Sequence, residues 1–108
     1  LPVDLRWVES FAVVAEELHF TRAARRLSIS QPAVSQHVAR LERQIGAQLF
    51  SRTSAGVVLT PAGLALWREV QPAMAGLRAG IAAARSAGGN AAGQLRVVHL
   101  SSYGPLDE

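Results

Sequence analysis

The chain has 108 residues, 49% hydrophobic and 18% charged, which fits one small domain with an appended element and excludes a large enzyme. Its formal net charge is +3, and all eleven basic residues are arginine. The basic charge is concentrated: residues 1–19 carry a net −3, whereas residues 20–60 hold six arginines against Glu42 alone.

Cysteine is absent, which argues against a disulfide framework and a thiolate metal site and suits a reducing compartment. The chain opens without a basic and apolar leader, and its apolar runs are only a few residues long. We therefore expect neither a signal peptide nor a membrane span, and we expect a cytoplasmic protein.

Two helices are predicted in the first 27 residues. An amphipathic helix is expected over 4–18, and Thr21 is a suitable N-cap for a short second helix over 22–27. In the second helix Ala23, Ala24 and Leu27 should face inward. The buried stripe of the first helix comprises Leu5, Val8, Phe11, Ala12, Ala15 and Leu18.

A third helix follows a tight break at 28–30, where Ile29 is expected to plug the corner between the helices. Ser30 is a good N-cap, Pro32 suits the first turn, and Gly46 can close the helix in the left-handed conformation. The predicted buried stripe of this helix is Val34, Val38, Leu41 and Ile45.

Beyond Gly46, two β-prone runs at 48–52 and 57–59 flank a turn at 53–56, which predicts a two-stranded wing. Thr60 and Pro61 then repeat the cap-and-proline start of a helix that runs to about Ala87. Pro72 should bend it, because proline removes a backbone hydrogen bond. Apolar residues at heptad spacing predict a dimer seam along this helix: Trp67, Val70, Met74, Leu77, Ile81 and Ala84.

The order of these elements predicts a mainly α fold, a winged helix-turn-helix followed by a long dimerisation helix. In this fold the third helix inserts its first residues into the DNA major groove. Its exposed tip carries residue types that can hydrogen-bond base edges or meet a thymine methyl group. The candidate base contacts are Gln31, Pro32, Ala33, Ser35 and Gln36.

Arginines surround this neutral tip. Arg22 lies in the first turn of the second helix, Arg40 and Arg43 lie further along the third, and Arg52 lies in the wing. Arginines at these positions are expected to contact the phosphates that flank the groove.

One spaced pattern resembles the DNA-binding domain of LysR-type transcriptional regulators. It consists of Phe20-Thr21-Arg22-Ala23-Ala24, Leu27, Ser30-Gln31-Pro32-Ala33-Val34-Ser35, Leu41-Glu42, Gly46, Leu49-Phe50, Arg52 and Leu59-Thr60-Pro61-Ala62-Gly63. The resemblance covers roughly residues 3–87. Many members carry arginine or lysine where this chain has Gln36, and further basic residues where it has Ala55 and Val57. These departures weaken the expectation of guanine readout and of a strong wing contact.

The resemblance implies a bacterial regulator that binds promoter DNA as a homodimer, or a tetramer when full-length. It further implies that a small-molecule effector binds in a separate C-terminal domain, and that these residues need no cofactor. The expected domains are the winged helix-turn-helix (1–60), the linker helix (61–87), a hinge (88–93) and the start of the effector domain (94–108), with a strand over 94–100. By matched position or location, the backbone and minor-groove contacts are Thr21, Arg22, Ser30, Arg40, Arg43, Arg52 and Thr53.

Two alternatives are weighed against DNA binding. A winged-helix protein-interaction module would need an apolar tip on the third helix, where this chain has polar residues. An enzyme would need a converging nucleophile, base and orienting acid, but Ser35 and His37 do not face each other on one helix. Three scattered histidines without cysteine also make no recognisable metal set, so we expect neither catalysis nor a metal. The phenylalanines and tryptophans are expected to pack in the core or in the dimer interface, away from the arginines.

Overall fold

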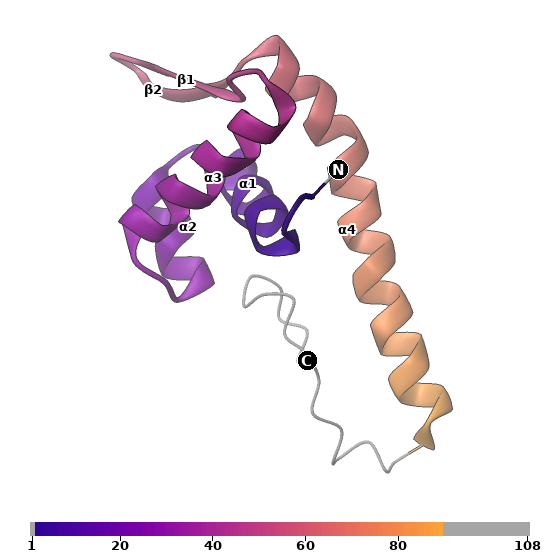
Figure 1. The fold of residues 1–108 in the computed structure, drawn as a ribbon. Helices are drawn as coiled ribbons and strands as arrows, with labels where there is room; N and C mark the ends of the chain where they lie inside the picture. The colour runs from indigo at the N-terminus through magenta and orange to yellow at the C-terminus, as the bar shows by residue number, and fades with distance from the viewer. Residues whose placement is uncertain (1, 90–108) are drawn as a thin grey trace.

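The computed structural model describes residues 2–89. Figure 1 shows three helices gathered into one body, a hairpin projecting from it, and a long fourth helix leaving it as an arm. The elements are α1 (Leu5–Glu17), α2 (Phe20–Leu27), α3 (Gln31–Ile45), β1 (Phe50–Thr53), β2 (Gly56–Leu59) and α4 (Pro61–Ala87). This arrangement confirms the predicted winged helix-turn-helix with an appended long helix.

Helix α1 lies against both α2 and α3 and supplies the centre of the core. Phe11, Ala12, Val13 and Val14 are all fully buried. The predicted apolar stripe was wrong at its two ends, because Leu5 is 43% and Leu18 41% exposed. Leu18 takes the left-handed conformation that ends α1, so it no longer belongs to the helical face that packs in the core.

Helix α2 begins two residues before the predicted start. His19, not Thr21, is its N-cap: the His19 Nδ1 atom accepts a hydrogen bond from the backbone N–H of Arg22 at 3.0 Å. Histidine is an uncommon cap, and Thr21 offered the stronger local signal. The earlier start brings Phe20 into the helix and into the core, where it is 8% exposed.

The break between α2 and α3 is made by Ser28 in the left-handed conformation, with φ of 58°. Ile29 does not plug the corner as predicted, since it is 37% exposed. The Ile29 backbone N–H instead donates to the Ala24 carbonyl and closes the end of α2.

Helix α3 has the predicted Ser30 cap and the predicted Gly46 terminus, with φ of 84° at Gly46. Its buried face consists of Val34, Val38 and Leu41. The prediction that Ile45 continues this face was wrong, because Ile45 is 45% exposed. Leu49, which follows the turn at Gly46, is fully buried.

The wing is an antiparallel pair in which Phe50 lies opposite Leu59 and Thr53 opposite Gly56. The first strand begins at Phe50 and not at the predicted Gln48, because Leu49 and Gln48 are bonded elsewhere. The Leu49 N–H donates to Glu42 Oε2 at 2.8 Å, and the Gln48 carbonyl accepts from the Thr60 hydroxyl at 2.6 Å.

Helix α4 begins at Pro61 and ends at Ala87, with the predicted N-cap Thr60, whose hydroxyl accepts from the Gly63 N–H. It continues through Pro72 without a break in the helix, and the bend expected there stays a prediction. Among the described elements α4 packs against α1 and β2.

The first half of the predicted dimer seam lies inside the core of the single chain. Val70 is 9% and Met74 3% exposed, and the Trp67 ring meets the Phe11 ring edge-on with centroids 6.3 Å apart. Val70 and Met74 are therefore not available to a second copy as the heptad spacing suggested, whereas Trp67 is only partly buried. Leu77, at 41% exposed, begins the part of the seam that the chain leaves uncovered.

Candidate nucleic-acid interface

The N-terminal end of α3 is held in place by its cap and its buried face. The Ser30 Oγ atom accepts from the Ala33 N–H at 3.2 Å, and Pro32 occupies the first turn. Because Val34 and Val38 point into the core, the opposite side of this end of the helix faces outward. We call Gln31, Pro32, Ala33, Ser35 and Gln36 the tip of α3.

The tip residues differ in how far they are exposed. Pro32 and Gln36 are exposed, whereas Gln31, Ala33 and Ser35 are half-buried. The Gln31 side-chain amide donates to Ser35 Oγ at 2.8 Å, which joins two of the polar groups. Gln36 therefore presents the most accessible amide, and a glutamine amide can pair with the N6 and N7 atoms of adenine.

Arginines extend from the tip along α3 and into the wing. Arg40 and Arg43 are exposed on α3. Arg52 in β1 lies over the Phe20 ring, with its guanidinium carbon 4.4 Å from the ring centroid. This cation–π contact joins the Arg52 guanidinium to a core aromatic residue, against the expectation that the aromatic residues lie away from the arginines.

The two threonines predicted to contact DNA both lie on the surface. Thr53 is already bonded within the wing turn: its hydroxyl donates to the Gly56 carbonyl and accepts from the Ala55 N–H, each at 3.1 Å. The Thr53 hydroxyl thus stabilises the turn of the wing, and the residue is exposed on the surface of the wing.

A hollow of about 320 Å³ separates α3 from the wing. The Glu42 carboxylate on one wall caps the Leu49 N–H, which ties the loop before the wing to α3. The hollow lies beside the tip and ends at Arg52, so the surface from α3 to the wing is concave. Its lining residues are Phe20, Ser35, Val38, Ala39, Glu42, Gln48, Phe50, Ser51 and Arg52.

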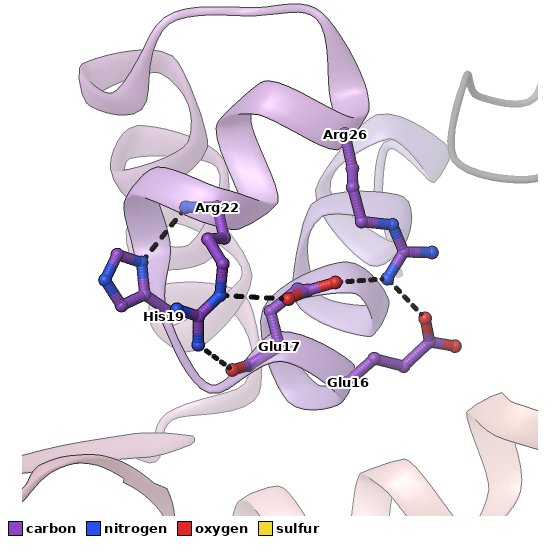
Figure 2. A network of polar contacts seen from close by, with 5 residues as sticks. All are labelled: Glu16, Glu17, His19, Arg22 and Arg26. Carbon is purple, nitrogen blue, oxygen red and sulfur yellow. Dashed lines mark hydrogen bonds and ion pairs between the residues drawn. The ribbon is translucent and has the colours of Figure 1, made fainter.

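Arg22 stands at the first turn of α2, but it is not an isolated charge. Figure 2 shows its side chain turned toward Glu17 at the end of α1. Arg26, in the last turn of α2, bridges Glu16 and Glu17 at 2.9 Å each. The hydrogen bond from Arg26 is the largest cause that lowers the pKa of Glu17; burial opposes it, and the hydrogen bond from Arg22 adds a smaller lowering. Sequence reasoning missed this cluster because its members come from two helices joined by a turn.

His37 faces α1 from the inner side of α3. Its Nδ1 atom is 2.7 Å from the Ser10 hydroxyl. Burial first, then the nearby Arg6 charge, lowers the His37 pKa, while Asp4 opposes the shift. A serine hydrogen-bonded to a histidine can act as a nucleophile with a general base. Ser10, however, is only 1% exposed and out of reach of a substrate. The pair therefore acts as a structural tie between α1 and α3.

Within residues 2–89, no three His, Cys, Asp or Glu side chains come together as a metal site would require. The same residues include no helix that is long and apolar enough to cross a bilayer. The predicted hinge at 88–93 is described only to residue 89, and the predicted strand at 94–100 lies outside the described residues.

Comparison with known proteins gives consistent matches. The family described as "Bacterial regulatory helix-turn-helix protein, lysR family" matches residues 5–64. The HTH-type transcriptional regulator YnfL of Escherichia coli K12 is 43% identical over 100 residues, which cover 93% of this chain and 34% of that regulator. The chain thus spans about a third of that relative's length.

Solved structures with a similar fold include complexes with DNA. The complex of the BenM DNA-binding domain with the catB site 1 DNA has a TM-score of 0.74 and 30% identity, and the match covers 81% of this chain and 98% of that one. The complex of Vibrio fischeri DarR with DNA has a TM-score of 0.71 and 31% identity, covering 82% of this chain and 30% of that one.

Proposed function

This chain belongs to the lysR family of bacterial regulatory helix-turn-helix proteins, and we propose that it reads a specific sequence in double-stranded DNA as part of a transcriptional regulator. The observation that carries the proposal is the exposed, capped tip of α3 with Gln36 at its surface and arginines on both sides. Polar side chains at the start of a recognition helix read base edges, and flanking arginines neutralise phosphates. The relatives solved with DNA support this assignment.

The contacts divide into two classes by chemistry. The tip residues would discriminate between sequences, with Gln36 reading adenine and Pro32 or Ala33 meeting a thymine methyl group. The arginines at 22, 40, 43 and 52, together with Thr21, Ser30 and Thr53, would hold the phosphates and add affinity to every sequence.

We propose that the protein acts as a homodimer through the outer half of α4. Leu77, Ile81 and Ala84 share one face of this helix by their heptad spacing, and Leu77 is 41% exposed. Two paired protomers would set two α3 helices in successive major grooves on one side of the duplex.

We propose no enzymatic role and no cofactor for DNA binding by these residues, and we expect the protein to act in the bacterial cytoplasm, where its DNA lies. Sensing of a small-molecule effector would belong to a C-terminal domain of the kind the resemblance implies. Anisotropy measured with and without EDTA should therefore give the same affinity for DNA.

Fluorescence anisotropy on a mixed-sequence duplex, repeated across a salt series, tests the proposal. A dimer that covers about six phosphates should lose affinity with a slope near −5 in log units. Arg40→Ala should weaken binding and make the slope shallower by about one unit per lost phosphate contact. The matched control is Arg85→Ala, which removes the same charge from the last turn of α4 and should leave binding unchanged.

Absence of binding at low salt, in a folded and dimeric sample, would contradict the proposal. The winged-helix protein-interaction module would then be the better reading, and the concave surface between α3 and the wing would be its first candidate contact.

A further inference from the structure

The contact between Arg22 and Glu17 uses only part of the arginine. Arg22 Nε donates to Glu17 Oε1 at 3.2 Å, and its Nη2 donates to the Glu17 backbone carbonyl at 3.5 Å (Figure 2). A guanidinium carries five N–H groups in a rigid plane, so the others remain able to donate to a further acceptor. The Arg22 side chain is 55% exposed, which leaves them within reach of an oxygen from outside the protein.

Glu17 is itself fixed from its other side. Its second oxygen, Oε2, accepts from Arg26 Nη1 at 2.9 Å, and the same Arg26 nitrogen lies 2.9 Å from Glu16 Oε1. Glu17 therefore lies between Arg26 and Arg22 and is the least exposed of the three side chains, whereas Arg22 is the most exposed. A lowered pKa keeps Glu17 ionised at neutral pH, so the arrangement persists there.

We propose that Glu17 is a positioning residue for DNA binding: it orients the Arg22 guanidinium so that its remaining N–H groups meet a backbone phosphate beside the first turn of α2. Arginine loses side-chain freedom when it binds a phosphate, and a contact already made in the free protein reduces that loss. This proposal rests on the proposed DNA binding and adds a role for an acidic residue that would otherwise repel DNA.

The neighbouring Glu16 provides a matched control. Glu16→Gln and Glu17→Gln remove the same charge one residue apart, but among the contacts described for these two side chains only those of Glu17 reach Arg22. Loss of an acidic charge near DNA should by itself leave binding unchanged or strengthen it. Glu17→Gln replaces the two charged oxygens that hold Arg22 and Arg26 by one neutral oxygen, so the contact to Arg22 should weaken. We therefore expect Glu17→Gln to bind DNA more weakly than Glu16→Gln.

The experiment measures anisotropy on one duplex for the 108-residue chain and for Glu16→Gln, Glu17→Gln, Arg22→Ala and the Glu17→Gln/Arg22→Ala double variant. Relative to Glu16→Gln, we expect Glu17→Gln to bind about three- to tenfold more weakly, the size of effect typical for directly contacting residues. This deficit should vanish in the Arg22→Ala background. In a salt series Glu17→Gln should make the slope shallower by about 0.9 for each protomer that contacts the duplex, as loss of one phosphate contact per protomer does, while Glu16→Gln keeps the slope.

The alternative role for Glu17 is competition, in which it occupies Arg22 and hides it from DNA. Glu17→Gln would then bind as tightly as Glu16→Gln or tighter, and that result would overturn the proposal. A deficit that persists without Arg22 would overturn it as well, because the effect would come from a general change in the fold. If the unmodified chain binds no duplex, both this proposal and the proposed function are overturned. If the unmodified chain binds DNA but Glu16→Gln and Glu17→Gln have equal affinity, only this proposal is overturned.

Discussion

Gln36 is the residue on which sequence preference should depend most. It is the one glutamine of the tip of α3 whose side chain is exposed. Gln36→Ala should change the preference between bases at one operator position by about 1–3 kcal/mol and leave non-specific affinity nearly unchanged. Selection from a random duplex pool with both proteins measures this. An identical preferred site for the two proteins would show that Gln36 does not read a base.

Gly63 is required by the close approach of α4 to the loop before the wing. A Cβ atom at this position would meet the Leu49 carbonyl oxygen and lie 2.9 Å from a methyl group of Leu59. Gly63→Ala should therefore lower the free energy of unfolding by about 1–3 kcal/mol, the usual cost of overpacking. Urea unfolding at a fixed protein concentration measures the loss.

The control for that change is Gly76→Ala in the same helix. Nothing lies within 4 Å of a Cβ built at Gly76, so alanine there should stabilise the chain by about 0.5–1 kcal/mol through helix propensity. Two glycine substitutions of the same kind are thus expected to have opposite signs. A loss at both positions would mean that close packing at Gly63 is not the cause.

At the scale of the elements, the contact between α1 and α3 should depend on pH through His37. Its pKa in the folded chain lies below the ordinary value near 6.5, so the folded state takes up protons less readily than the unfolded state. The stability is therefore complete above pH 6.5 and falls as the pH drops from there toward the folded pKa.

Thermal unfolding between pH 7.5 and 5 measures this dependence above the range in which carboxylates titrate. His37→Gln keeps an acceptor for the Ser10 hydroxyl but has no titration, so its midpoint should vary less with pH than that of the unmodified chain. Equal slopes for the two proteins would assign the pH dependence to groups other than His37.

The elements that the sequence predicted correctly are those with strong local signals. Ser30 and Thr60 as caps, Gly46 as a helix terminus and the hydrophobic face of α3 at Val34 and Val38 all depend on neighbours within a turn or two. The tip of α3 was predictable for the same reason, because a capped start and a buried face together fix which side points outward.

The features that were missed depend on contacts between elements. His19 replaces Thr21 as the cap of α2 because the chain reverses between α1 and α2, which no local propensity records. Ile45 lies beyond the reach of the core, although it continues the helical period. The Glu17 contacts cross the same turn between α1 and α2, so spacing along one helix could not indicate them.

At the scale of the whole molecule, the seven-residue repeat of α4 serves two purposes. Its first half completes the core of one chain, with Met74 at 3% exposed, and only its second half projects beyond the domain (Figure 1). Heptad spacing alone does not distinguish these uses, since both require apolar residues on one face. Packing within one chain therefore leaves only the outer half of the α4 heptad face for contact with a second copy.

If the outer half of α4 pairs two protomers, Leu77→Glu should produce a monomer, because a buried unpaired carboxylate is unfavourable at an apolar interface. The matched control is Ala79→Glu, which adds the same charge roughly on the opposite side of α4. Light scattering after size exclusion gives the mass of each protein, and thermal unfolding checks that the domain stays folded. Monomeric Leu77→Glu should also bind a two-half-site duplex more weakly than Ala79→Glu, because the second half-site is no longer engaged by the same complex. If Leu77→Glu remains dimeric, the dimer interface lies outside this part of α4. Another contact would then set the distance between the two recognition helices.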